Sequence, residues 1–274
     1  MKIAVLLTVH NRCEKTVKCL RSFIEQDSFS TDLYDIYLVD DGCTDQTKDE
    51  VSQSFPFVHI ISGDGTLFWN RGMLLAWETA VSQQAYDAYL WLNDDVDLMP
   101  GALNALNKYS AKHPDCIIVG AMCGVTDSNE ITYSGYIKKR TIKLEPRETE
   151  LECDCFNGNV VIIPSSVYEK VGMLDPYFRH SCGDFEYGYR AKKKGVQSYV
   201  IPAIGKCDRN IGGPKWLSKD ISLIDRFKKL YSPLGNNPFE EFKVTKYESF
   251  FSAIALFLYL NICACFPSFS NYNK

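Results

Sequence analysis

The sequence predicts an α/β fold, in which helices flank a mostly parallel sheet and a helical extension follows at the C-terminus. Short apolar runs of strand length alternate with stretches of helical periodicity over the first 120 residues. Parallel strands need such crossovers, because a tight turn cannot join them. Three of the apolar runs also end in polar, acidic or glycine-rich turns. Ligands of these sheets bind beyond the carboxyl ends of the strands, so the three turns predict one shared site.

The composition is that of a globular protein. The chain has 274 residues, of which 46% are hydrophobic and 23% charged, and its net charge is −4. This excludes a disordered chain, and we expect no nucleic-acid partner. The 11 cysteines show no repeated C-x-x-C spacing, which indicates reduced thiols in the cytoplasm. The apolar run at the N-terminus is short for a signal peptide, and we interpret it as a buried strand.

Strands and helices alternate in the first 120 residues. The first helix is indicated by Val17, Leu20 and Phe23 at helical spacing. Thr44 or Asp45 can cap the second helix. The expected strands are 3–9, 35–39, 58–61, 88–92 and 117–119, and the expected helices are 13–26, 45–54, 70–85 and 101–112.

The pattern changes after residue 120. The second part is expected to contain a strand or hairpin at 131–137, strands at 160–163 and 198–201, and helices at 165–171 and 183–194. A glycine-rich loop follows at 205–215. The extension is expected to hold two helical stretches, 218–231 and 238–266, around a turn at 233–235.

An acidic turn follows the fourth predicted strand. Asp94, Asp95 and Asp97 stand close together there, and their carboxylates repel one another unless a cation lies between them. Oxygen ligands of this kind suit Mg²⁺ or Mn²⁺. The alternative is a solvated turn in which the aspartates cap a helix. The buried residues directly before the turn, Trp91 and Leu92, favour the cation.

Two further turns carry polar side chains. Asp40 and Asp41 end the second strand, where a carboxylate can accept from a ribose hydroxyl or a base N–H; an ordinary Asp-Gly turn is the alternative. Arg12 follows the first strand and can bind phosphate through two hydrogen bonds, whereas we interpret His10 as a surface-loop residue. The glycines at 63 and 65 do not form a dinucleotide-binding fingerprint.

Asp184 is expected in the first turn of the helix at 183–194. A carboxylate at a helix N-terminus stays ionised, and an ionised carboxylate beside a sugar hydroxyl can act as a general base. The alternative is that Asp184 only caps the helix, while Glu186 pairs with Arg190 at i, i+4 spacing.

Five segments together resemble bacterial family-2 glycosyltransferases with the GT-A fold, a Rossmann-like architecture. They are MKIAVLLTVHNR, YLVDDGCTD, GDGTLFWNRGM, YLWLNDDVDLMPGAL and the run from FNGNVVIIP to GDFEYGYRAKKKG. The resemblance covers residues 1–210 and implies a catalytic domain with a nucleotide-sugar-binding half at 1–120 and an acceptor-binding half at 121–210. Residues 211–274 form the extension. It also implies a nucleotide-diphospho-sugar donor, Mn²⁺ or Mg²⁺, and an inverting single displacement.

The resemblance implies roles for individual residues. Asp184 matches the catalytic base, although Gly183 stands where the family has a Glu, and Glu186 is the fallback base. Asp95 is the expected metal ligand. The donor-binding residues implied are Thr8, Asn11, Arg12, Asp40, Asp41, Asp64, Asn70 and Asp94. On the acceptor side we expect Trp69, Asn157, Glu186 and Arg190.

The expected activity is that of a glycosyltransferase of the hexosyltransferase type (EC 2.4), which takes one sugar from a UDP- or dTDP-linked donor. Capsule, O-antigen or other cell-surface polysaccharide synthesis is the expected setting. A sugar-nucleotidyltransferase is one alternative, but it would need a glycine-rich basic loop after the first strand, where this chain has T-V-H-N-R. A non-catalytic nucleotide-sugar-binding protein is the other.

The tail at 250–266 is strongly apolar. It has 15 apolar residues of 17 and ends at Pro267, whereas a membrane-spanning helix needs about 20. A basic amphipathic stretch at 225–231 precedes it. We therefore expect the protein on the inner face of the cytoplasmic membrane, peripherally bound, with a glycan acceptor that a polyprenyl diphosphate can carry. The alternatives are a buried C-terminal helix and a homodimer contact.

Overall fold

The computed structural model describes residues 1–138, 140, 142–209 and 213–270. Its main sheet has the order β10-β13-β6-β12-β4-β1-β2-β3. The strands on this path are β1 (Ile3–Val9), β2 (Tyr34–Asp40), β3 (His59–Ser62), β4 (Ala88–Leu92), β6 (Ile117–Cys123), β10 (Leu151–Cys153), β12 (Val160–Pro164) and β13 (Ser198–Lys206). Short β5 (Asp97–Leu98) and β7 (Ile131–Tyr133) pair with β13 and β6.

Most strands of this path run in one direction, as predicted. β1 is parallel to β2 and β4, β2 to β3, and β13 to β6. β12 is antiparallel to both β4 and β6. The amino end of β12 therefore lies at the same edge as the carboxyl end of β4, and the Asn93 amide donates to the carbonyl of Asn159 across this edge at 2.9 Å.

Helices cover both faces of the sheet. β1 is buried along its whole length, and its side chains alternate between two apolar cores. Leu7 packs in the core that includes Phe23, and Leu6 in the core that includes Trp77. The first core lies beneath α1 (Cys13–Ile24), α2 (Thr47–Ser54) and α4 (Ala102–Lys112), and the second beneath α3 (Phe68–Gln83), α5 (Ser165–Val171) and α6 (Gly183–Lys193).

The predicted strand ends needed correction in the second half. β6 continues to Cys123 and β13 to Lys206 because each pairs with the other beyond a register shift. The predicted hairpin at 131–137 is divided between two sheets: β7 joins the main sheet, whereas β8 (Gly135–Ile137) pairs with β9 (Ile142–Lys143) and β11 (Cys155–Phe156). Of the predicted loop at 205–215, residues 210–212 lie outside the described residues.

The C-terminal extension forms α7 (Leu223–Leu230), α8 (Pro238–Thr245) and α9 (Phe250–Cys265), with short 3-10 turns η1 (Lys215–Leu217) and η2 (Pro267–Phe269). The single helix predicted at 238–266 is wrong. Ser249 is extended, and its side chain accepts from the Ser252 amide, which starts a new helix. Likewise, α7 begins at Leu223 instead of 218, because Ser222 caps it through the Asp225 amide.

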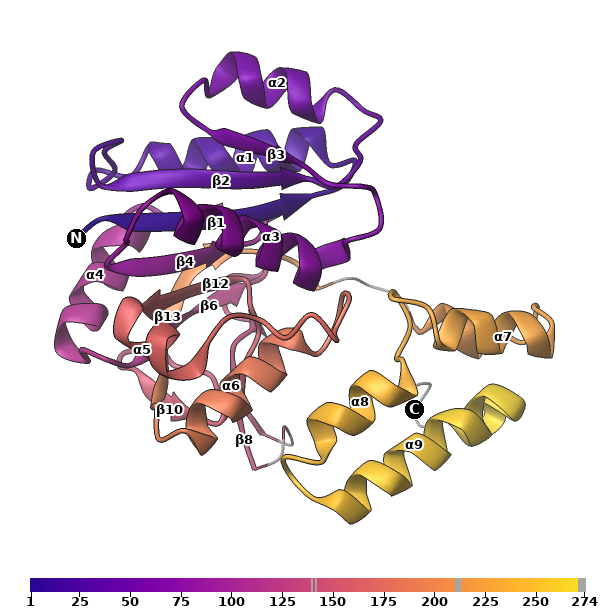
Figure 1. Ribbon diagram of the computed structural model, residues 1–274. Helices are drawn as coiled ribbons and strands as arrows, with labels where there is room; N and C mark the ends of the chain where they lie inside the picture. Colours follow the sequence, from indigo (N-terminus) through magenta and orange to yellow (C-terminus); the bar gives the residue numbers. More distant parts are fainter. Residues whose placement is uncertain (139, 141, 210–212, 271–274) are drawn as a thin grey trace.

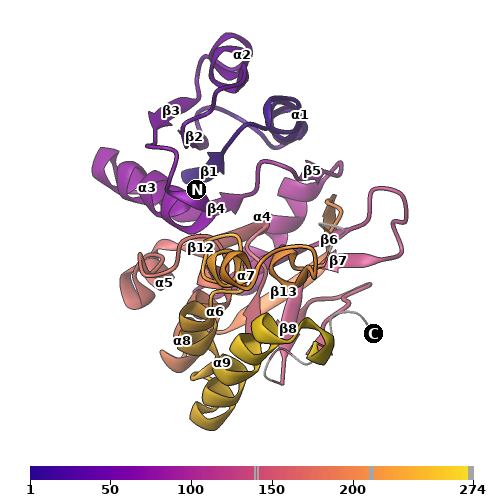
Figure 2. The same cartoon turned by 90° about the vertical axis from the view of Figure 1, so that its right-hand side faces the viewer.

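The three C-terminal helices stand at the edge of the sheet toward which the parallel strands point (Figure 1). Viewed from that side, they lie in front of the second half of the domain (Figure 2). Four ion pairs fix α8 and the turn after it to the domain: Arg179–Glu240 at 3.0 Å, Lys243–Asp175 at 2.6 Å, Arg140–Glu248 at 2.9 Å and Arg140–Glu241 at 3.6 Å. The extension is thus packed beside the edge where the site was predicted.

Candidate active site

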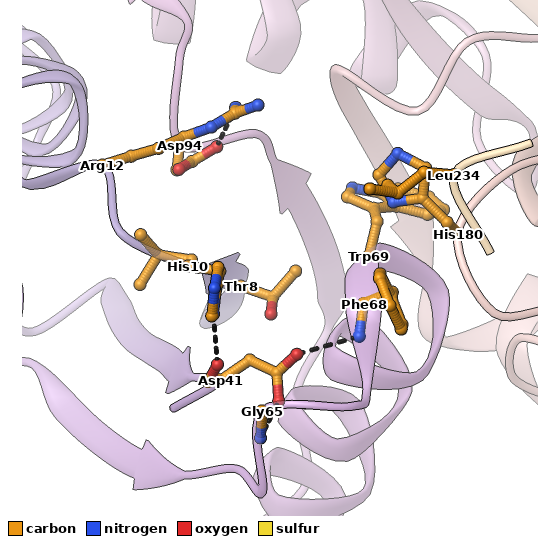
Figure 3. A pocket seen from close by; sticks show the side chains of 11 residues that line it. Thr8, His10, Arg12, Asp41, Gly65, Phe68, Trp69, Asp94, His180 and Leu234 are labelled. Atoms are coloured by element: carbon orange, nitrogen blue, oxygen red, sulfur yellow. Dashed lines mark hydrogen bonds and ion pairs between the residues drawn. The ribbon is translucent and has the colours of Figure 1, made fainter. Parts of the chain in front are cut away.

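A cavity of about 270 Å³ opens at the carboxyl ends of β1, β2 and β4 (Figure 3). Its size is at the lower end of the range for small-molecule sites. It is lined by Thr8, Val9, His10, Arg12, Asp41, Gly65, Phe68, Trp69, Asp94, His180 and Leu234. Five predicted site residues are thereby brought together from separate turns: Thr8, Arg12, Asp41, Trp69 and Asp94. We call this space the donor cavity.

Arg12 joins the two carboxylates that follow β4. Its Nη1 donates to Asp94 Oδ1 at 3.2 Å and to Asp95 Oδ2 at 3.0 Å. Asp94 is only 6% exposed. Burial raises the pKa of Asp94 to about 7, the nearby Asp95 adds to this, and Arg12 opposes it. The three side chains form a compact charged group, of which Arg12 and Asp94 line one wall of the donor cavity.

This group fits a divalent cation. Asp94 Oδ2 is buried and has no hydrogen-bond partner among the described residues, so it offers an oxygen ligand. Within the described residues, no group of three or more His, Cys, Asp or Glu side chains is placed to hold a metal by itself. Asp94 and Asp95 would supply one or two ligands, which is how Mg²⁺ is commonly held when substrate phosphates complete its shell.

Asp41 organises the opposite wall. Its carboxylate accepts from the backbone amides of Gly65 at 2.8 Å, Phe68 at 2.9 Å and Leu67 at 3.3 Å. Its carbonyl oxygen contacts Nδ1 of His10 at 2.6 Å. His10 is exposed on a loop, as expected, and it also borders the cavity. Asp41 therefore holds the loop before α3 against the end of β1.

Four predicted donor-binding residues support the walls without lining the cavity. Asn11 Oδ1 accepts from the Thr44 amide at 2.7 Å, and Asp40 Oδ1 from the Cys43 amide at 2.8 Å. Asp64 closes a turn onto Thr66. Asn70 is fully buried, and its Nδ2 donates to the carbonyls of Asp175 and Phe178 at 2.9 and 3.0 Å. Their predicted contacts with the donor stay predictions.

Asp184 stands beside the Trp69 wall. Its Oδ2 accepts from the Gly158 amide at 2.9 Å, and its Oδ1 from the Phe185 amide at 2.8 Å. Gly158 is wedged between the two side chains: a Cβ there would lie 2.7 Å from the Trp69 ring and 3.3 Å from Asp184 Cβ. Burial raises the pKa of Asp184 to about 6, although the two amide hydrogen bonds oppose the shift.

Gly183 begins α6 against Asn70. A Cβ at this position would fall 1.8 Å from Asn70 Oδ1, so no side chain can stand there without displacing Asn70. This explains in physical terms why the chain has glycine where the resemblance predicts Glu. The close approach lets Asn70 bind the loop before α6 while Asp184 keeps its place in the first turn.

The other residues predicted on the acceptor side have structural partners. Glu186 is buried and pairs with Arg190, whose guanidinium donates to both carboxylate oxygens at 2.9 and 3.1 Å. Tyr247 also donates to Glu186 at 2.9 Å. Asn157 Oδ1 accepts from the Ser134 amide at 3.2 Å. None of the three lines the donor cavity, and Glu186 is too fully paired to serve as a fallback base.

The cavity residues that were not assigned to the site from the sequence include two from distant segments. His180 lies in the loop before α6, and its buried Nδ1 has no partner within the described part of the chain. Burial and the charge of Arg12 lower the pKa of His180. Leu234 reaches the cavity from the turn between α7 and α8. No local signal marks either residue, because only the packing of distant segments brings them to the wall.

Comparison with known proteins decides the family. The sequence model described as Glycosyl transferase family 2 matches residues 4–171. The chain belongs to glycosyltransferase family 2. No curated protein matches the sequence.

Solved structures confirm that this family-2 chain has the predicted GT-A-type fold. A crystal structure of S. aureus TarS is similar, with a TM-score of 0.59 and 13% identity over 96% of this chain. This chain spans only 55% of that one. A structure of S. aureus TarS 1-349 in complex with UDP-GlcNAc is also similar, with a TM-score of 0.56 and 15% identity. The match covers 96% of this chain and 73% of the other. Identities this low carry the fold and nothing finer.

Proposed function

We propose that this family-2 glycosyltransferase moves one sugar from a nucleotide-diphospho-sugar to an acceptor hydroxyl with inversion of configuration. One observation carries the proposal: Arg12, which pairs with Asp94 and Asp95, and Asp94 itself line the same cavity whose Trp69 wall adjoins Asp184. A group that binds a diphosphate and a group that accepts a proton therefore stand on one edge of the sheet.

The donor is proposed to be UDP- or dTDP-linked. The TarS structure in complex with UDP-GlcNAc supports a uridine nucleotide. Arg12 binds the diphosphate through its free guanidinium face, and Thr8 and Asp41 border the space left for the nucleoside. A bound Mg²⁺ or Mn²⁺ on Asp94 and Asp95 would offset the charge that develops on the leaving group. The donor sugar then points toward Trp69.

Asp184 is proposed as the general base. Its ionised carboxylate takes the proton from the acceptor hydroxyl while that oxygen forms a bond to the anomeric carbon. The bond from this carbon to the diphosphate oxygen breaks on the opposite face, and the nucleoside diphosphate leaves. The two amide hydrogen bonds fix the carboxylate in position before the acceptor arrives.

The acceptor is proposed to be a growing cell-surface glycan, with a polyprenyl diphosphate as its carrier in capsule or O-antigen synthesis. The sugar is proposed to be a hexose. All 11 cysteines are described and unpaired, which supports a reducing compartment and so a cytoplasmic location.

The test is a donor panel on the purified protein. UDP- and dTDP-hexoses with Mn²⁺ should release nucleoside diphosphate, and a chelator should slow this release at least tenfold. NMR of the first product formed from an α-linked donor should show the β anomer. The proposal would be contradicted if none of the donors in the panel released nucleoside diphosphate. Retention of the α configuration in the product would contradict it as well.

A further inference from the structure

The outer side of α9 is apolar and exposed. The helix carries no charged residue, and one side is buried on η1 and α7 through Leu260, Cys263 and Ala264. The other side is formed by Phe251, Ile254, Ala255, Leu258, Ile262 and Cys265, all of which are exposed. Phe251 is 81% exposed and Leu258 54%. A helix that is apolar all round is normally buried, so this side indicates a missing partner.

The apolar surface continues beyond α9. Within the described residues, 11 of the 17 exposed large hydrophobic side chains fall between positions 223 and 269. They include Leu223 and Ile224 at the start of α7, and Phe266 and Phe269 after α9. Arg226 holds α7 on the end of α9 through the carbonyl of Ala264 at 2.8 Å. We call the exposed apolar residues of α7, of α9 and of the segment 266–269 the apolar platform. Both helices face the viewer in Figure 2.

Exposed lysines lie on the same segment of the chain as the apolar platform. The exposed basic residues of this part of the chain are Lys215, Lys219, Lys228, Lys229 and Lys246, whereas Asp220 and Asp225 are its exposed acidic residues. The glutamates of α8 are instead paired inward with arginines, as Glu240 with Arg179. An apolar surface on a segment with an excess of exposed lysines is complementary to a bilayer with anionic headgroups.

The turn between α7 and α8 connects the apolar platform with the donor cavity. Leu234 in this turn is 71% exposed and also lines the cavity, beside His180 and Trp69 (Figure 3). A partner surface that covers α7 and reaches Leu234 would therefore extend to the mouth of the donor cavity. Among the described helices, none is long and apolar enough to cross a membrane.

We propose that the apolar platform docks on an anionic lipid bilayer and thereby sets the mouth of the donor cavity at the headgroup level. Entry of a lipid-linked acceptor at this mouth rests on the proposed function, whereas the docking itself does not. A second copy of this chain is the less suitable occupant, because a two-fold contact through this surface would bring the exposed lysines of the two copies close together.

Vesicle flotation of the full chain tests the proposal. The protein should float with vesicles of phosphatidylethanolamine and phosphatidylglycerol, and bind pure phosphatidylcholine at least tenfold more weakly. The double variant Phe251→Ser/Leu258→Ser should lower the partition coefficient at least tenfold, because two exposed side chains lose their place in the bilayer. Lys228→Glu/Lys229→Glu should abolish the preference for the anionic lipid. Val125→Ser removes an exposed apolar residue elsewhere, at 49% against 54% for Leu258, and should change nothing.

UDP binding, measured by calorimetry without lipid, shows that each variant is folded. The same measurement separates the docking from the proposed function. Loss of flotation with intact UDP binding supports docking. Wild-type protein that binds UDP but ignores anionic vesicles would overturn the docking and leave the proposed function standing. A stable dimer that the same double variant dissociates, without vesicle binding, would overturn it in favour of a second copy.

Discussion

The Asp184 carboxylate accepts a hydrogen bond from the Gly158 amide at 2.9 Å, across 26 positions of the chain. The bond joins the first turn of α6 to the residues before β12. Because β12 runs antiparallel to β4, these residues reach the edge where the parallel strands end. The reversed strand is thus what brings the second half of the domain against the donor cavity.

The pH dependence of turnover should follow Asp184. Its pKa is raised to about 6, and only the ionised form can accept a proton. At saturating donor, kcat should fall about tenfold per pH unit below 6 and be level above it. Steady-state rates between pH 4.5 and 8.5 check this, and a kcat that is constant down to pH 5 would exclude Asp184 as the base.

The same carboxyl should make stability depend on pH. Its folded pKa lies above the ordinary value of 3.8, so the folded state holds the proton more tightly than the unfolded state. Its contribution to stability is present below about pH 4 and is lost as the pH rises to about 6. Denaturant unfolding of wild type and Asp184→Asn should show the wild type losing stability relative to the variant over that window, and parallel curves would contradict it.

Asp41 should matter more for stability than for direct contact with the donor. Asp41→Ala leaves three backbone amides without their acceptor and should lower the free energy of unfolding by about 2–4 kcal/mol. Asp64→Ala is the matched control, since Asp64 binds only its own exposed turn and its loss should leave the unfolding midpoint nearly unchanged. Equal effects of the two substitutions on the unfolding midpoint would contradict the role of Asp41 in holding the loop before α3.

Gly183 should tolerate no side chain. Gly183→Ala places a Cβ against Asn70 Oδ1 and should lower the free energy of unfolding by about 1–3 kcal/mol. Gly183→Glu, the residue that the family resemblance suggests, should do no better. Gly213→Ala serves as the control, because a Cβ there meets nothing within 4 Å. A Gly183→Glu variant with wild-type stability and higher activity would contradict this prediction.

Arg179 should connect the extension to the cavity wall. It pairs with the buried Glu240 and donates to the Tyr231 carbonyl at 3.1 Å, and His180 follows it directly. Arg179→Ala strands a buried carboxylate and should lower the free energy of unfolding by about 3 kcal/mol, while raising KM for the donor. Glu240→Gln should lower the free energy of unfolding by less, because the Arg179 side chain that loses its partner is more exposed to solvent than Glu240. Thermal unfolding and donor KM, measured for both variants, check this order.

Much of the fold could be predicted from local patterns. The run at Ile3–Val9 is apolar except for Thr8, which favours a buried strand, and the structure confirms it. The acidic and polar turns after β1, β2 and β4 meet because parallel strands place their carboxyl ends together. The family resemblance added the expected role of Asp184, which no spacing rule supplies.

What the sequence could not provide depends on distant packing. The break at Ser249 lies where a charged stretch ending at Glu248 meets the apolar run that starts at Phe250, and a single serine at such a boundary does not decide between a continuous helix and a cap. Leu234 and His180 enter the cavity wall only because α8 is held on the loop before α6. Asp41 and Asn70 have local surroundings typical of ligand contacts, yet their side chains bind backbone.

Asp184→Asn tests the central claim most directly, because it keeps the shape of the side chain and removes its basicity. UDP affinity and sugar transfer should be measured on the same preparation in the presence of Mn²⁺. We expect the Kd for UDP to stay within about twofold, while kcat falls by about 10²–10⁴. Transfer at the wild-type rate, or a loss of UDP binding as large as the loss of turnover, would contradict the assignment of Asp184 as the base.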